Sequence, residues 1–166
     1  MANRIVTLCM NPALDITTST PTVGHTEKLR CAAPRYDPGG GGINVAHVAE
    51  VLGSPATAVF PAGGPAGEVV HDLMVAEGLA VRRVRIGGST RESFTVNEHS
   101  TGRQYRFVLP GPQLTVAEQT ECLLQLRRAV SDSAIVVASG SLPPGVPDDF
   151  YQQVARICSE LGTTFL

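Results

Sequence analysis

Short apolar runs alternate with amphipathic helical faces along most of this chain, and this alternation constrains its fold more than any other feature. Buried strands are predicted at four apolar runs, 5–10, 57–60, 134–138 and 163–166. Helices with one apolar face are predicted at 45–52, 69–74, 122–130 and 150–161. Parallel strands need a crossover between them, so the alternation predicts a parallel α/β sheet flanked by helices.

The middle of the chain departs from this alternation. Short β-prone segments with interleaved polar residues lie at 81–86, 93–98 and 105–109. Their spacing and the turn residues between them predict a small antiparallel sheet that stands off the main body. A further short strand is predicted at 29–33, and the proline and glycines of 36–42 predict a loop after it.

Composition fits one globular domain and excludes several classes of partner. The 166 residues include 13 Lys and Arg and 15 Asp and Glu, so the formal net charge is −2. This balance provides no basic surface for nucleic acid or for an anionic membrane. The first apolar run is too short for a signal peptide, and Asn11-Pro12 ends it. We therefore expect a cytoplasmic protein without a membrane span.

The four cysteines are far apart and form no C-x-x-C pair or metal-ligand spacing with histidine. Cys9, Cys122 and Cys158 lie in apolar segments, which favours buried thiols over disulfides. The four histidines are scattered, and we expect structural or solvated roles for them. No metal site is predicted.

Four consecutive glycines at 39–42 run directly into the first predicted helix. Bare backbone lets a ligand approach closely, and a helix N-terminus offers N–H groups to anionic or hydroxylated ligands. The alternative is a flexible surface loop, which does not by itself explain four glycines before a strong helix. The Gly-Lys-Ser/Thr of a P-loop is absent. The run also lies outside the first tight turn after a strand, where dinucleotide-binding glycines occur.

Four further residues are candidates for ligand binding. Asp15 follows the first strand and can accept hydrogen bonds from two neighbouring sugar hydroxyls, although it also suits a turn. Arg91 can hold a phosphate through two N–H groups, and Lys28 is the only lysine in the chain. Both cations are equally explained as solvated surface charges. Ser141 lies at a strand end, but the Gly-x-Ser-x-Gly pattern of a nucleophile elbow is not met.

Taken together, these segments resemble the ribokinase-like PfkB carbohydrate kinase family. The N-terminal motif of that family is a glycine cluster, an Asn, a small residue and glycines at set distances, here matched by 40–46, Gly53 and Gly63. The resemblance runs from residue 5 to residue 166, and it is strongest to the minor bacterial 6-phosphofructokinase type. Related 1-phosphofructokinases and tagatose-6-phosphate kinases commonly carry a Lys in the glycine cluster. Its absence here favours fructose 6-phosphate.

The resemblance implies a role for each matching position. The implied substrate-binding residues are Asp15, Gly39, Gly40, Asn44, Arg91 and Ser141. Among them, Asp15 would hold sugar hydroxyls and Arg91 would meet the sugar phosphate. Lys28 would lie near the phosphates on a small β lid, with strands within 27–36 and 90–110. That lid would cover the sugar and form a homodimer contact. One position departs from the pattern, because Ser93 stands where relatives often carry Asn.

The second motif of the family, a Gly-Ala-Gly-Asp loop, occurs nowhere in the 166 residues. In the family its Asp deprotonates the acceptor hydroxyl, and the pocket for ATP with Mg2+ lies in the same half. The resemblance therefore implies the N-terminal part of a sugar kinase domain, with no catalytic residue and no activity by itself. Two alternatives remain open, a non-catalytic sugar-phosphate-binding or dimerising module and an unrelated dinucleotide-binding domain.

Overall fold

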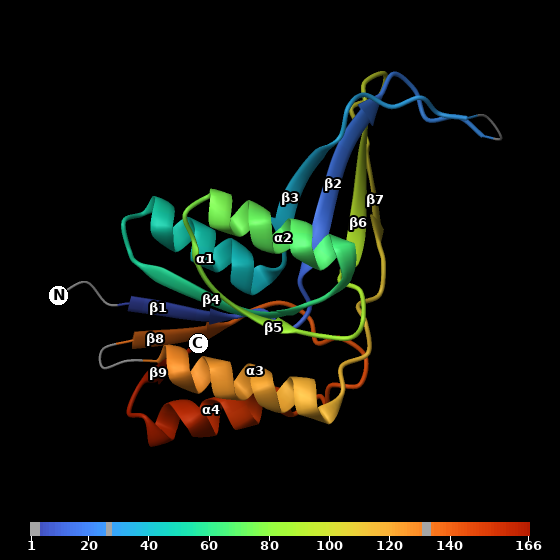
Figure 1. The fold of residues 1–166 in the computed structure, drawn as a ribbon. Coiled ribbons are helices and arrows are strands. Elements are labelled where there is room, and N and C mark those ends of the chain that lie inside the picture. The colour runs from blue at the N-terminus through green and yellow to red at the C-terminus, as the bar shows by residue number, and fades with distance from the viewer. Residues whose placement is uncertain (1–3, 26–27, 131–133) are drawn as a thin grey trace.

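The computed structural model of this chain describes residues 4–25, 28–130 and 134–166. Within these ranges the chain forms two sheets, and the second rises from one end of the first (Figure 1). The main sheet has five parallel strands in the order β5 (Ala80–Arg85), β4 (Ala56–Ala62), β1 (Arg4–Leu8), β8 (Ala134–Ala138) and β9 (Thr164–Phe165). The second sheet has four strands in the order β3 (Arg35–Gly39), β2 (Ala13–Thr20), β6 (Arg91–Glu98) and β7 (Gln104–Val108).

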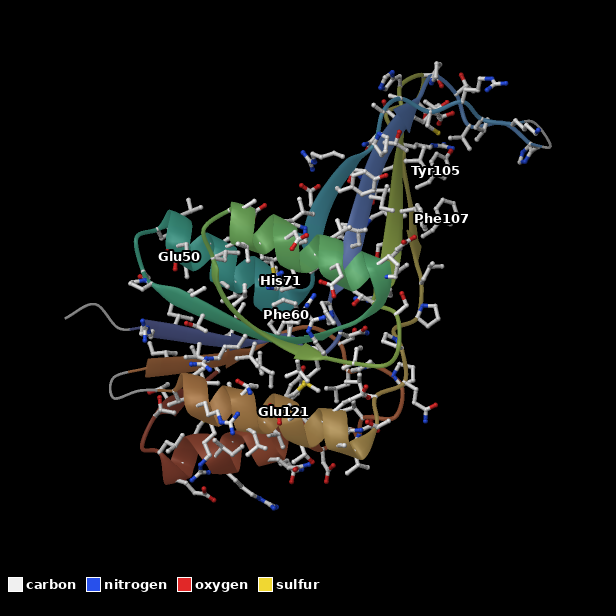
Figure 2. The ribbon with its side chains drawn as sticks, viewed as in Figure 1. Glu50, Phe60, His71, Tyr105, Phe107 and Glu121 are labelled. Carbon is white, nitrogen blue, oxygen red and sulfur yellow. The ribbon has the colours of Figure 1, made fainter. Side chains whose placement is uncertain are left out.

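Helices cover both faces of the main sheet (Figure 1). One side carries α1 (Gly41–Val51) and α2 (Gly64–Ala76), and the other carries α3 (Val116–Ala129) and α4 (Phe150–Glu160). Leu8 packs in the core with Phe150 of α4. Phe60, labelled in Figure 2, packs in the opposite core with Val70 of α2. Side chains alternate along a strand, so a sheet buried on both faces needs continuous apolar runs. The predicted parallel α/β sheet flanked by helices is therefore confirmed.

The second sheet is mixed rather than wholly antiparallel. Its central strands β2 and β6 pair in parallel, and the outer strands β3 and β7 pair antiparallel with them. Asp15 lies in register with Asp37 and Ser93 on one face of this sheet. Ile16, one residue further along β2, lies in register with Tyr36 on the opposite face. Alternation thus gives the sheet one polar and one apolar face.

Several predicted boundaries near the second sheet are wrong. The strand predicted at 29–33 does not form, since residues 28–34 lie in no strand. Residue 27, at the start of the range given for the lid strands, lies outside the described residues. The predicted loop at 36–42 instead begins with β3, which is the edge strand and therefore tolerates Pro38. β2 was not predicted at all, because its run of threonines and serine masks the alternation.

The segment 81–86 also belongs elsewhere than predicted. It forms β5, the edge strand of the main sheet, paired in parallel with β4. Its polar residues reflect that edge position, because Arg83 forms an ion pair with Glu68 of α2 at 2.7 Å. The hairpin predicted at 93–98 and 105–109 is present as β6 and β7.

Cys9, Cys122 and Cys158 are buried thiols, as predicted, and Cys31 is exposed. Burial raises the pKa of the Cys122 thiol to about 12. Across the described ranges, no helix combines the length and the apolar character that crossing a membrane requires.

Candidate functional site

The candidate site lies where the carboxyl ends of β1 and β8 meet the base of the second sheet (Figure 1). The chain leaves β1 through Asn11 and leaves β8 through Ser139 and Ser141. Ser139 N donates to Leu8 O at 3.2 Å, and Gly42 N donates to Ser139 O at 3.0 Å. These bonds tie both strand exits to the start of α1. Ligands of open α/β sheets bind outside the carboxyl ends of the strands, so this edge is the place to look for a site.

The glycine run predicted as a loop is divided between two elements. Gly39 is the last residue of β3, and Gly41 and Gly42 begin α1. A Cβ on Gly42 would lie 2.6 Å from Leu8 O, so glycine is required for α1 to approach β1 this closely. The run is therefore shaped by packing within the chain.

Gly39 and Gly40 leave space for side chains from neighbouring strands. A Cβ on Gly39 would overlap the carboxylate of Asp15, and a Cβ on Gly40 would lie 2.5 Å from Cys9 Sγ. Gly40 also has a φ of +123°, which other residues rarely adopt. At the start of α1, the backbone N–H of Gly42 already donates to Ser139 O. That helix terminus is thus partly satisfied by the chain itself rather than left for a ligand.

Asp15 is half-buried on the polar face of the second sheet, between Asp37 on β3 and Ser93 on β6. Burial raises the pKa of the Asp15 carboxyl. A hydrogen bond from Ser93 and the positive charges of Arg91 and Arg106 act in the opposite direction. The carboxyl group therefore has several polar neighbours while part of it stays accessible, which suits it to accept hydrogen bonds from ligand hydroxyls.

Arg91 begins β6, in register with Ala13 of β2. Its Nη2 donates to Asn11 O at 3.0 Å, and its Nη1 donates to Leu109 O at 3.5 Å. Its Nε is buried and has no hydrogen-bond partner in the described part of the chain. A guanidinium has five N–H donors, so the two carbonyls hold Arg91 in place and leave donors for an anion.

A polar cavity of about 590 Å³ extends over the face of the second sheet that carries Asp15. Hydroxyl, amide, carboxylate and guanidinium groups make up most of its lining, which consists of Asp15, Thr17, Thr18, Ser19, Ala33, Arg35, Asp37, Thr95, Asn97, Gln104 and Arg106. Small-molecule sites commonly have volumes of about 300–1,000 Å³. The cavity therefore has the size and the polarity for a small hydroxylated ligand.

The remaining predicted residues are only partly brought together. Ser141 lies near the base of the second sheet, where its Oγ accepts a hydrogen bond from Asn11 Nδ2 at 3.0 Å. Asn44 is exposed on α1 and lines a separate cleft of about 180 Å³ with Asp37. Lys28 is exposed in residues 28–34, which lead into β3. Of the predicted binding residues, only Asp15 lines the cavity; Arg91, Ser141, Gly39, Gly40, Asn44 and Lys28 do not.

Two residues of this region have no role in the sequence-based prediction. Asn11 is interpreted there only as the end of a strand, yet it is 7% exposed and bonds to both Arg91 and Ser141. Asp37 falls in a predicted loop, yet it lies opposite Asp15. A polar residue directly after a buried parallel strand is the signal that points to Asn11, because such positions lie at the ligand-binding edge.

Nearly the whole chain matches one protein family. Residues 6–166 match the profile described as pfkB family carbohydrate kinase. The chain belongs to this family. That membership confirms the resemblance found in the sequence, including the glycine cluster at the start of α1.

The pfkB family chain has curated and structurally solved relatives. ATP-dependent 6-phosphofructokinase isozyme 2 of Mycobacterium tuberculosis (strain ATCC 25618 / H37Rv) is 61% identical over 163 residues, which cover 98% of this chain and 48% of that protein. The tetrameric inhibited form of Escherichia coli phosphofructokinase-2 has a TM-score of 0.92 at 42% identity, covering 99% of this chain and 54% of that one. The same Escherichia coli protein in complex with fructose-6-phosphate has a TM-score of 0.87 at 41% identity, covering 99% and 53%. The chain thus spans about half the length of the relatives it matches.

Proposed function

We propose that this chain supplies the sugar-binding part of an ATP-dependent 6-phosphofructokinase, which converts fructose 6-phosphate into fructose 1,6-bisphosphate. The observation that carries the proposal is the placement of Asp15 and Arg91 on adjacent parallel strands at the carboxyl edge of the main sheet. Asp15 can accept hydrogen bonds from the hydroxyls of a phosphosugar, and Arg91 can donate hydrogen bonds to its phosphate. The 61% identity to a 6-phosphofructokinase supports this choice of sugar.

The residues of this chain bind and orient the sugar in the proposed reaction. Asp15 accepts hydrogen bonds from ring hydroxyls, and Arg91 donates to the 6-phosphate, so the 1-hydroxyl is held in a fixed direction. The oxygen of that hydroxyl bonds to the γ-phosphorus of ATP as the bond to ADP breaks, and its proton passes to a general base. In the family that base lies in the Gly-Ala-Gly-Asp motif, which this sequence does not contain.

The described residues contain no group of three or more His, Cys, Asp or Glu side chains that could hold a metal ion. Mg2+ in nucleotide sites is commonly held by one or two carboxylates together with the phosphates. Because this sequence lacks the Gly-Ala-Gly-Asp motif, the site for ATP with Mg2+ is proposed to lie mainly in the other half of the kinase. We locate the reaction in the cytoplasm, where phosphosugars and ATP are retained.

Calorimetric titration of the purified chain with fructose 6-phosphate tests the proposal. We expect one binding site, and we expect Asp15→Asn to weaken it by about 10–100-fold, because hydrogen bonds to a charged acceptor are lost. The matched control is Asp72→Asn, whose side chain is 79% exposed on α2 and should leave binding unchanged. Fructose 1-phosphate and tagatose 6-phosphate test the alternative substrates. No binding of fructose 6-phosphate, or tighter binding of either alternative, would contradict the proposed substrate.

The second sheet is also proposed to form a homodimer contact. On its apolar face, Ile16 is in register with Tyr36 and with Phe94, and Phe94 is in register with Phe107. Tyr36, Phe94 and Phe107 are 46%, 36% and 57% exposed, and Phe107 points away from the body (Figure 2). An exposed apolar row of this kind is typical of an interaction surface.

Sedimentation velocity distinguishes a dimer from a monomer. We expect the chain to sediment as a dimer and Phe107→Ser to shift it toward monomer, because the substitution removes an aromatic anchor from the row. Leu161→Ser is the control, since Leu161 is 40% exposed directly after α4, a helix that lies far from the second sheet (Figure 1). A monomeric unmodified chain would rule out this contact.

A further inference from the structure

Asn11 connects parts of the chain that lie far apart in the sequence. Its backbone carbonyl accepts a hydrogen bond from Arg91 Nη2 at 3.0 Å, and its side-chain Nδ2 donates to Ser141 Oγ at 3.0 Å. Two of its four polar groups therefore bond to other residues of the site. Asn11 is the one described residue that bonds to both Arg91 and Ser141.

The bond to Ser141 determines which way that hydroxyl can act. A serine hydroxyl has one O–H donor and can accept through its oxygen lone pairs. Because Ser141 Oγ accepts from Asn11, its own hydrogen stays available, and Ser141 is exposed. Arg91 likewise keeps unused N–H donors after its two bonds to backbone carbonyls. The two groups that Asn11 holds are thus both donors, which is what a phosphate needs.

The Asn11 side chain is held in one position. It is 7% exposed, and a Cβ on Gly111 would overlap its Oδ1, so the backbone at Gly111 packs directly against the amide. Oδ1 is buried and has no hydrogen-bond partner within the described ranges. A buried, unpaired oxygen costs stability, and an apolar side chain of similar size would avoid that cost. Asparagine at this position is therefore not explained by stability.

We propose that Asn11 is a positioning residue that holds Ser141 and Arg91 as two donors to one phosphate group of the sugar. The inference rests on the proposed function, because it takes the phosphate to be that of the sugar substrate. Asn11 itself does not touch the ligand in this proposal. It acts by directing the Ser141 hydrogen outward and by fixing the guanidinium of Arg91.

Two substitutions of Asn11 separate positioning from packing. Asn11→Leu keeps the approximate size and removes both the donor and the unpaired oxygen, so we expect an unchanged or higher thermal midpoint. We expect its affinity for fructose 6-phosphate to fall about tenfold, as for a lost hydrogen bond to a charged group, and its affinity for unphosphorylated fructose to change less than about twofold. Asn11→Asp keeps the shape but accepts the Ser141 hydrogen and adds negative charge. We expect it to lower the affinity for fructose 6-phosphate by more than Asn11→Leu does.

A double-mutant cycle read by calorimetric titration decides the inference. In a Ser141→Ala background, Asn11→Leu should change the affinity for fructose 6-phosphate by less than about twofold, because the hydroxyl that Asn11 directs is gone. Gln152→Leu, which replaces an exposed amide on α4, is the matched control and should have no effect. If Asn11→Leu does not fold, Asn11→Ala in the same cycle supplies the comparison, because it removes the amide without adding charge.

Each outcome has a definite meaning. Fully additive effects of the Asn11 and Ser141 substitutions, or equal losses for fructose and fructose 6-phosphate, overturn the inference and leave the proposed function intact. The same holds if the unmodified chain binds fructose 6-phosphate and both Asn11 variants bind it equally well. Absence of binding by the unmodified chain overturns the inference together with the proposed function.

Discussion

The main sheet and the second sheet bury their side chains in different ways. Helices cover both faces of the main sheet, and large side chains such as Phe60 and Phe150 have no exposed surface. The second sheet has a polar face over the cavity at Asp15, and on its other face Phe94 and Phe107 remain partly exposed. Apolar burial stabilises the main sheet with its four helices, here called the body. The second sheet relies more on hydrogen bonds and on the partners proposed for its two faces. The main sheet thus suits a rigid support, whereas the second sheet has surfaces free for a ligand and a partner.

The largest expected effect comes from removing an aromatic ring in the body. Phe60→Ala should lower the free energy of unfolding by about 3–5 kcal/mol, because Phe60 is fully buried. Phe107→Ala, on the edge of the second sheet, should lower it by less than about 1 kcal/mol in the monomer. Urea denaturation followed by circular dichroism measures both. Similar losses for the two variants would show that the second sheet is packed as tightly as the body.

A smaller and more local effect is expected at Glu98, near the tip of the second sheet. Glu98 is 4% exposed and accepts hydrogen bonds from the Thr101 hydroxyl, from Val23 N at 2.7 Å and from the Tyr105 hydroxyl at 3.3 Å. The Thr101 hydroxyl, followed by the Val23 N–H, holds the pKa of the Glu98 carboxyl below its usual value. A group whose pKa is lower in the folded state stabilises the fold above its unfolded pKa. That contribution is lost as the pH falls through the folded pKa.

As the pH falls, the hydrogen bonds to Glu98 at the tip of the second sheet should therefore weaken before the body changes. In an NMR pH titration, we expect the Val23 amide resonance to shift with a midpoint below the ordinary glutamate pKa, while amides of β1 and β4 stay unchanged. Glu98→Gln should remove this titration and reduce protection of the tip amides from hydrogen exchange at neutral pH. A midpoint at the ordinary value, or simultaneous changes in β1, would contradict the separation of the two regions.

The smallest expected effect has the opposite sign. Burial raises the pKa of the Asp15 carboxyl, so its charged form is less favourable in the folded chain than in the unfolded one. The resulting loss of stability develops as the pH rises through the folded pKa and is absent below the unfolded pKa. Asp15→Asn should therefore raise the thermal midpoint slightly at pH 7 and leave it unchanged near pH 2. A lower midpoint at pH 7 would indicate that Arg91 and Arg106 outweigh burial.

The body was more predictable from the sequence than the second sheet, for physical reasons that particular residues make clear. Leu8, Val59 and Val136 lie in continuous apolar runs, and such runs identify strands buried on both faces. β2 is buried less evenly, and its threonines give a weak alternation that does not mark a strand. β3 includes Pro38, which local rules assign to a loop and which only the edge position in the sheet makes acceptable.

The sequence suggests residues for the candidate site but not the bonds between them. The binding roles of Asp15, Arg91 and Ser141 follow from the family resemblance and stay predictions, and the structure places these residues near the junction of the two sheets. The role proposed for Asn11 depends on bonds to residues 80 and 130 positions away, which no local pattern reveals. Asn44 shows the reverse case, since it matches the motif but is exposed on α1 and lines a separate cleft.

The parallel pairing of β2 with β6 sets an order of events during folding. Ala13 pairs with Arg91, so the central pair of the second sheet joins segments on either side of α1, β4, α2 and β5. Closing so long a loop costs entropy that is recovered only when the intervening elements are already compact. During synthesis on a ribosome, β2 emerges early, and it can pair with β6 only after α1, β4, α2 and β5 have emerged. The face that carries Asp15 is therefore expected to be completed only after α1, β4, α2 and β5 have assembled.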